Sequence, residues 1–140
     1  MMKVLFVCIH NSARSQMAEA FVNRLSGGRV LAQSAGLTPG ELNLFVVEVM
    51  KEEGIDISNS QAKGMDGFIQ RGEHFDYVIT VCDETSAAQC PVFPGKTKRL
   101  HWGFEDPSAL QLSGEDKVIR TRMIREQIKA KVITWLSLNA

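Results

Sequence analysis

The chain has 140 residues, of which 44% are hydrophobic and 23% are charged, and its 16 Lys and Arg residues balance its 16 Asp and Glu residues. This length suits one hydrophobic core, so we expect residues 1–140 to form a single domain. A net charge of zero disfavours a broad surface for nucleic acid or anionic membrane, and no apolar run is as long as a membrane span. We therefore expect a soluble, cytoplasmic protein without a signal peptide, which binds neither nucleic acid nor membrane.

The first half of the chain alternates between strand and helix patterns. Residues 3–8 are a short apolar run typical of a buried strand, and residues 13–25 place apolar side chains at helical spacing before two glycines. Residues 29–36 predict a second strand. Residues 41–54 contain a second helix, which a glycine ends.

The second half continues the alternation. After a loop around residues 56–67, residues 76–82 predict a third strand, residues 99–102 a short fourth strand, and residues 115–138 a closing helix. One face of that helix is apolar and carries Ile124, Ile128, Val132, Trp135 and Leu136. The fold class predicted is α/β, a three-layer sandwich in which helices flank a four-stranded parallel sheet on both sides.

A cysteine and an arginine six positions apart bracket the first loop. Residues 9–13 lie between a buried strand and a helix N-terminus, where backbone N–H groups and the helix dipole form a nest for a tetrahedral oxyanion. Arg14 adds a two-pronged donor, and the same positive field favours the thiolate form of Cys8. These features predict that Cys8 is a nucleophile, the alternative being a small buried side chain that ends a strand.

Two polar side chains have candidate roles in supporting this loop. Ser15 can donate a hydrogen bond to the Cys8 sulfur, and Asn11 can hold the loop or adopt a left-handed backbone conformation. The alternative is that both residues only cap the helix. The predicted oxyanion site comprises Cys8, Ile9, His10, Asn11, Ser12, Ala13, Arg14 and Ser15.

An aspartate after the fourth strand is a candidate proton donor. Ligands of such sheets bind at the carboxyl ends of the strands, so Asp106 is expected at the same sheet edge as Cys8. A nucleophile that attacks an oxyanion needs an acid for the oxygen that leaves. Asp106 is followed by Pro107, and an ordinary Asp-Pro turn is the alternative.

The three cysteines, Cys8, Cys82 and Cys90, include no C-x-x-C pair. They make a poor disulfide framework and an incomplete zinc site, and the three scattered histidines form no metal motif. We expect no metal site and no tightly bound cofactor. In a reducing compartment, such cysteines are candidates for reactive thiols.

The motifs "VCIHNSARSQMAEA" and "EDP" resemble the low-molecular-weight tyrosine phosphatase fold, and "ITVCDETSAAQCP" with "HWGFEDP" resembles the thioredoxin-coupled arsenate reductases built on it. The resemblance implies that Cys8 attacks arsenate, that Arg14 and the loop amides hold its oxygens, and that Asp106 protonates the departing oxygen. Cys82 then attacks Cys8 and releases arsenite. Cys90 next attacks Cys82, and external thioredoxin reduces this redox-active disulfide.

Some members of that family bind potassium near the loop through an Asn, a Glu, a Ser and an Asp. Asn11, Glu19 and Ser34 match the first three, whereas Lys63 stands where the aspartate aligns. Because a lysine ammonium is a compact cation, we hypothesise that Lys63 replaces the ion and pairs with Glu19. These residues and Ser15 are the predicted supports of the loop.

Two other functions remain open at this point. The same loop and Asp-Pro pair would serve a phosphatase for phosphotyrosine or a small phosphomonoester, although residues 106–109 lack the aromatic side chain usual in such phosphatases. A thiol sensor of oxidation would leave Arg14 and Asp106 without a role. For a reductase, phosphate and sulfate are expected to compete with arsenate, the reductant is thioredoxin or a glutaredoxin-like protein, and a monomer is expected.

Overall fold

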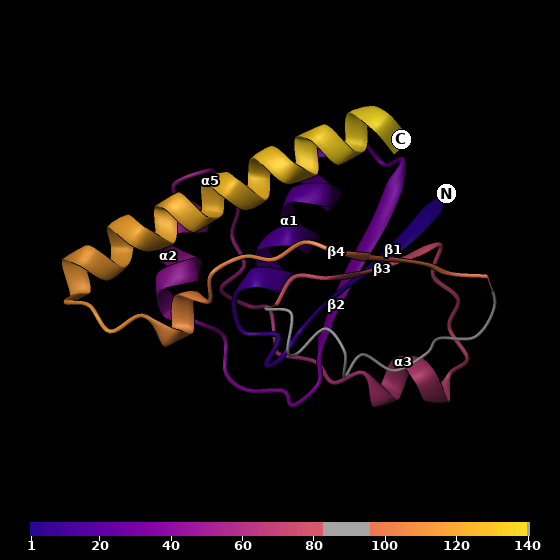
Figure 1. The fold of residues 1–140 in the computed structure, drawn as a ribbon, viewed down its shortest axis with the longest axis horizontal. Helices are drawn as coiled ribbons and strands as arrows, with labels where there is room; N and C mark the ends of the chain where they lie inside the picture. Colours follow the sequence, from indigo (N-terminus) through magenta and orange to yellow (C-terminus); the bar gives the residue numbers. More distant parts are fainter. Residues whose placement is uncertain (83–95, 140) are drawn as a thin grey trace.

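Residues 1–82 and 96–139, which this computed structural model describes, form a parallel sheet with helices on both faces (Figure 1). The strand order is β2-β1-β3-β4, and each pair of neighbours is parallel. This arrangement confirms the predicted four-stranded α/β sandwich. In chain order the elements are β1 (Met2–Cys8), α1 (Arg14–Leu25), β2 (Val30–Gly36), α2 (Leu44–Lys51), α3 (Asp66–Gln70), β3 (Tyr77–Thr80), β4 (Lys98–His101), the 3-10 helix η1 (Pro107–Ala109) and α5 (Gly114–Asn139).

The two faces of β1 belong to two separate hydrophobic clusters. Val4 and Phe6 lie in the larger cluster, to which α1, α2 and α5 contribute, while Leu5 and Val7 lie in the smaller one beside α3. All four side chains are at most 1% exposed. Because successive side chains of a strand point to opposite faces, a strand buried on both sides has the continuous apolar sequence seen here.

The closing helix α5 crosses α1 and α2 on one side of the sheet (Figure 1). The five side chains predicted on its apolar face are all buried: Ile124, Ile128, Val132, Trp135 and Leu136. The ring of Trp135 lies edge-on to Tyr77 of β3 and to Trp102, with centroid distances of 5.3 and 6.1 Å. The predicted packing face is therefore confirmed.

Two short elements differ from the sequence pattern. α2 begins at Leu44 because the Asn43 side chain caps it. The Asn43 oxygen accepts hydrogen bonds from the amides of Phe45 and Val46 in the first turn. α3 begins within the predicted loop, and its Phe68 ring packs edge-on against Phe75. A helix of five residues is too short to show a periodic pattern.

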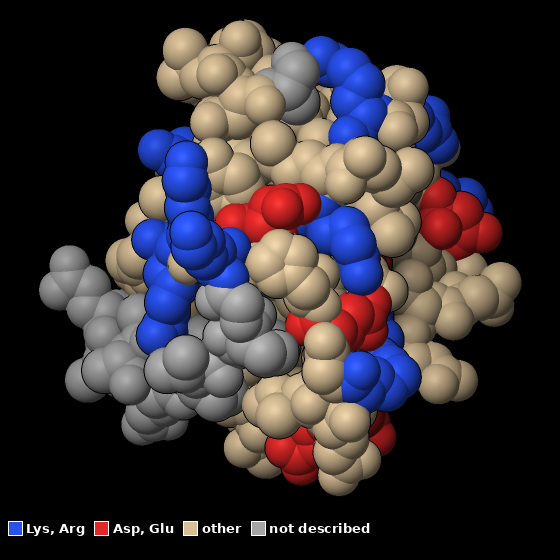
Figure 2. All heavy atoms as spheres, turned by 90° about the vertical axis from the view of Figure 1, so that its right-hand side faces the viewer, with Lys and Arg blue, Asp and Glu red and all other residues tan. Residues whose placement is uncertain are grey.

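The face where the strands begin carries charges of both signs (Figure 2). Basic and acidic side chains are interspersed at its centre, and Lys3 and Arg71 each lie 3.1 Å from Glu73. Within the described residues, no helix has the length and apolar character needed to cross a membrane. The opposite face, where the parallel strands end, brings together the candidate site.

Candidate active site

Cys8 ends β1, and the chain turns through residues 9–13 before α1 begins at Arg14. The thiol-bearing residue is 3% exposed, and Arg14 is 4% exposed. Asn11 has a φ of +52°, a left-handed conformation that asparagine tolerates better than most residues. That conformation closes the loop between strand and helix, as predicted.

The Cys8 sulfur lies 3.0 Å from the Ser15 hydroxyl and accepts a hydrogen bond from the Asn11 amide at 3.1 Å. The Asn11 side chain donates to the same hydroxyl at 2.7 Å, which leaves the Ser15 hydrogen for the sulfur. Two hydrogen-bond donors therefore converge on this one sulfur. Neither side chain caps α1, whose N-cap is Ala13 without a side-chain hydrogen bond, so the capping alternative is wrong.

Asn11 also ties the loop to a distant segment. Its carbonyl oxygen Oδ1 accepts from the Lys63 amide at 2.8 Å and from the Gln16 Nε2 at 3.0 Å. Gln16 is 1% exposed and donates further to the backbone carbonyls of Asn11 and Gln61. Sequence reasoning missed Gln16, and its one signal is a polar residue in the first turn of a helix that packs on the core.

Arg14 and Asp106 meet at this sheet edge, as predicted. One guanidinium nitrogen of Arg14 donates to the Phe104 carbonyl at 3.0 Å, and the other lies 3.6 Å from the Asp106 carboxylate. The second oxygen of Asp106 accepts from the Ser108 amide and so begins η1. The acid is thereby fixed beside the arginine.

Ser108 links the segment that carries Asp106 to the loop of residues 9–13 that follows Cys8, which we call the cysteine loop. Its hydroxyl accepts a hydrogen bond from the Asn43 side chain at 2.9 Å and lies 3.5 Å from the Ser12 hydroxyl. Three segments that are far apart in the chain therefore meet around Ser108. Sequence reasoning singled out neither Ser108 nor Asn43, because a serine and an asparagine in loops carry no distinctive pattern.

The predicted supports Glu19, Ser34 and Lys63 lie together behind the loop. The Ser34 hydroxyl donates to Glu19 at 3.2 Å, and the Lys63 ammonium lies 3.9 Å from the same carboxylate oxygen. Burial raises the pKa of Glu19, while the charge of Lys63 and the hydrogen bond of Ser34 act in the opposite direction. A cationic side chain therefore neutralises a partly buried carboxylate next to the loop.

Of the two other cysteines, one lies within the described residues. Cys82 follows β3, is 1% exposed and belongs to the same hydrophobic cluster as Cys8. Cys90 lies outside the described residues. Of the histidines, the exposed His10 approaches the Thr38 carbonyl, and His101 lies 2.7 Å from the Thr80 hydroxyl. Within residues 1–82 and 96–139, no three His, Cys, Asp or Glu side chains group as metal ligands would.

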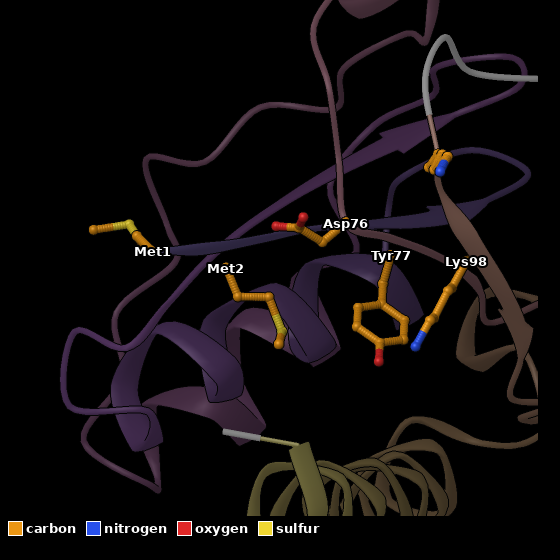
Figure 3. A pocket seen from close by; sticks show the side chains of 6 residues that line it. Met1, Met2, Asp76, Tyr77 and Lys98 are labelled. Carbon is orange, nitrogen blue, oxygen red and sulfur yellow. The ribbon is translucent and has the colours of Figure 1, made fainter.

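A cavity of about 460 Å³ lies at the end of the sheet opposite Cys8 (Figure 3). Its lining consists of Met1, Met2, Asp76, Tyr77, Lys96 and Lys98, which come from the amino ends of β1, β3 and β4. These residues offer no thiol and no loop of inward-pointing amides. The residues predicted to carry the chemistry lie instead at the opposite edge, where β1 ends at Cys8.

Comparison with known proteins agrees with the fold. The pattern of the low molecular weight phosphotyrosine protein phosphatases matches residues 3–139. The chain belongs to this family. A solved low molecular weight protein tyrosine phosphatase from T. tengcongensis is 26% identical, covers 98% of this chain and 99% of its own, and superposes with a TM-score of 0.78.

Arsenate reductases are also among its relatives. The arsenate reductase of Bacillus subtilis (strain 168) is 39% identical over 125 residues, which is 89% of this chain and 88% of that protein. A solved arsenate reductase in its oxidized state is 30% identical over the full length of both chains, with a TM-score of 0.82. A thioredoxin-dependent arsenate reductase of Corynebacterium glutamicum is 32% identical, covers this whole chain and 64% of its own, and has a TM-score of 0.70.

Proposed function

We propose that this protein is a thioredoxin-dependent arsenate reductase. The observation that carries the proposal is the Cys8 sulfur, which the Asn11 amide and the Ser15 hydroxyl hold between a buried strand and the helix that begins at Arg14. The likeness to arsenate reductases over most of the chain supports the choice of substrate. The resulting activity reduces arsenate to arsenite, which is one step of arsenic detoxification.

The first step joins sulfur to arsenic. The Cys8 thiolate attacks arsenate held by Arg14 and the amides of residues 9–15, an S–As bond forms, and one As–O bond breaks. Asp106, 3.6 Å from Arg14, gives its proton to the departing oxygen, which leaves as water. Phosphate and sulfate are tetrahedral oxyanions of similar size, so they compete for the same loop.

The next steps transfer electrons through three thiols. Cys82 attacks the Cys8 sulfur, an S–S bond forms, and the electrons of the broken S–As bond stay on arsenic, which leaves as arsenite. Cys90 then attacks Cys82, which frees Cys8 as a thiolate and leaves a disulfide between Cys82 and Cys90. Two thiols of external thioredoxin reduce that disulfide, so no tightly bound cofactor is required.

The proposal extends to the organisation of the chain. Residues 1–140 form a single reductase domain that acts as a monomer in the cytoplasm. Lys63 takes the place of a potassium ion beside Glu19, from which it is separated by 3.9 Å. Exchange of potassium for sodium should then leave the activity unchanged, and clear activation by potassium would refute this role of Lys63.

The decisive experiment follows NADPH oxidation by the purified protein with thioredoxin and thioredoxin reductase after arsenate is added. Wild type should turn over arsenate. Cys90→Ser should lose turnover because it stops at the disulfide between the buried Cys8 and Cys82, which thioredoxin cannot reach. Without turnover of arsenate, hydrolysis of an aryl phosphate by the wild type would instead assign a phosphatase. Such a phosphatase would lack the usual aromatic side chain after Asp-Pro, since Ser108 stands there and binds the Asn43 side chain.

A further inference from the structure

The carbonyl groups of the cysteine loop are all directed to partners outside it. The amides of residues 37, 38, 40 and 43 donate to the carbonyl oxygens of Cys8, Ile9, His10 and Ser12, at 3.1, 2.8, 3.0 and 2.8 Å. We call residues 36–43 the backing segment. With its carbonyl groups held on one side, the loop presents its amide groups to the other side, where an anion would lie.

The remaining loop carbonyls and one side chain complete this pattern. The Asn11 carbonyl accepts from Gln16 at 3.2 Å, and the Ala13 carbonyl accepts from the Met17 amide of α1 at 3.0 Å. On the outer side, the His10 ring lies 2.9 Å from the Thr38 carbonyl, which can only accept, so Nδ1 is the donor. The backing segment therefore holds both the backbone and one side chain of the loop.

Gly36 allows the backing segment to lie directly against the loop. A Cβ atom at this position would lie 2.7 Å from the Asn11 amide nitrogen, 2.8 Å from the His10 carbonyl carbon and 2.9 Å from the Ile9 oxygen. All three are backbone atoms, so no side-chain rotation relieves the overlap. An added methyl group would have to displace the loop itself.

We propose that the backing segment is a positioning element that aims the loop amides at the oxyanion, with Gly36 as the residue that permits its close approach. This inference rests on the proposed function, because it assigns to residues 36–43 the orientation of the same oxyanion site. An anion site of aligned amides binds tightly only when the amides are fixed before the anion arrives. The backing segment supplies that fixation.

Three variants that each add one methyl group test the proposal. At Gly36 the new Cβ meets loop backbone at 2.7 Å, at Gly40 it meets the His10 Cβ at 3.3 Å, and at Gly114 it meets nothing within 4 Å. Gly114→Ala is therefore the matched control. The dissociation constant of phosphate is measured by protection of Cys8 from iodoacetamide, with mass spectrometry of the Cys8 peptide, and KM and kcat for arsenate are measured in the thioredoxin-coupled assay.

The expected results follow the three distances. The phosphate dissociation constant and the KM for arsenate should rise about tenfold or more in Gly36→Ala and roughly twofold to threefold in Gly40→Ala, and neither should change in Gly114→Ala. Circular dichroism and the midpoint of thermal unfolding report whether each variant folds. A general loss of stability would lower that midpoint without this graded loss of anion affinity.

Two results would overturn the inference. One is a folded Gly36→Ala protein that binds phosphate like the wild type. The other, should Gly36→Ala not fold, is a Gly40→Ala protein whose phosphate affinity equals that of Gly114→Ala. Failure of the proposed function has a different signature, because the wild type itself would then show no turnover of arsenate, even where phosphate still protects Cys8.

Discussion

Two polar clusters of this protein differ in burial and therefore in what their hydrogen bonds achieve. The loop network, which consists of Cys8, Asn11, Ser15 and Gln16, is at most 3% exposed. The surface network joins the end of α2 to α5 through Glu52, Glu53, Arg122, Arg125 and Lys129. Its distances are as short as 2.7 Å, yet water competes for most of its members.

The comparison shows that the length of a hydrogen bond alone does not indicate how much free energy its loss would cost. In the loop network a lost partner leaves a buried polar atom unsatisfied, which costs about 1–3 kcal/mol. In the surface network water replaces the lost partner. The buried cluster therefore fixes the geometry around the Cys8 sulfur, whereas the exposed cluster forms ion pairs between the end of α2 and α5.

The largest effect is expected when the sulfur of the loop network is replaced. Cys8→Ser keeps the shape of the loop but substitutes a far weaker nucleophile, so arsenate-dependent NADPH oxidation should fall by at least about a thousandfold. Phosphate binding, measured by calorimetry, should persist. Appreciable residual turnover would show that another residue carries the first step.

Removal of the acid beside Arg14 should have the next largest effect. Asp106→Asn cannot donate the proton that the departing oxygen needs, so kcat should fall by about a hundredfold or more. The Asn43→Ala variant is the control, since it removes a contact of Ser108 but leaves the acid in place. Equal losses of kcat in the two variants would mean that Asp106 serves only to order η1.

A single hydrogen bond of the loop network should matter less. Ser15→Ala removes a donor to the Cys8 sulfur and leaves the Asn11 side chain unpaired. We expect kcat to fall about tenfold and the free energy of unfolding to fall by about 1–2 kcal/mol. Alkylation of Cys8 at the wild-type rate in this variant would contradict the assignment of Ser15 as a donor to the thiolate.

The smallest effect is expected in the surface network, and it should depend on pH. The hydrogen bond from Arg122 is the main reason that the pKa of Glu52 is lowered from 4.5 to about 2. The stabilisation is therefore complete above the unfolded pKa of 4.5 and is lost as the pH falls toward 2. Glu52→Gln should unfold a few degrees below wild type at pH 7, and the difference should shrink over this range and in high salt.

An unchanged difference in midpoint between pH 5 and the acid limit would show that Glu52 contributes packing rather than charge. The arsenate reductase activity of Glu52→Gln should equal that of the wild type, since this side chain pairs with α5 and not with the loop. Loss of activity would remove the distinction between the two networks.

The elements around the reactive loop could be predicted well from the sequence. The apolar run that ends at Cys8 and the helical spacing that begins near Arg14 locate the strand, the loop and the helix without further information. The placement of Asp106 at the same edge also follows, because parallel strands align their carboxyl ends. The short helix α3 could not be predicted, since its packing on Phe75 rather than its own pattern stabilises it.

By itself, the sequence predicted the alternation of β1, α1, β2, α2, β3, β4 and α5 along the chain, the burial of β1 on both faces, and the candidate residues for the chemistry. Periodicity and loop position are local properties, so they can be read along the chain. Only the tertiary structure decided which backbone groups hold the loop: the Lys63 amide on Asn11, the Gln16 side chain beneath it, and the backing segment made possible by Gly36. The contacts of Lys63 and of the backing segment join distant segments through backbone atoms, which every residue possesses, and so leave little trace in the sequence.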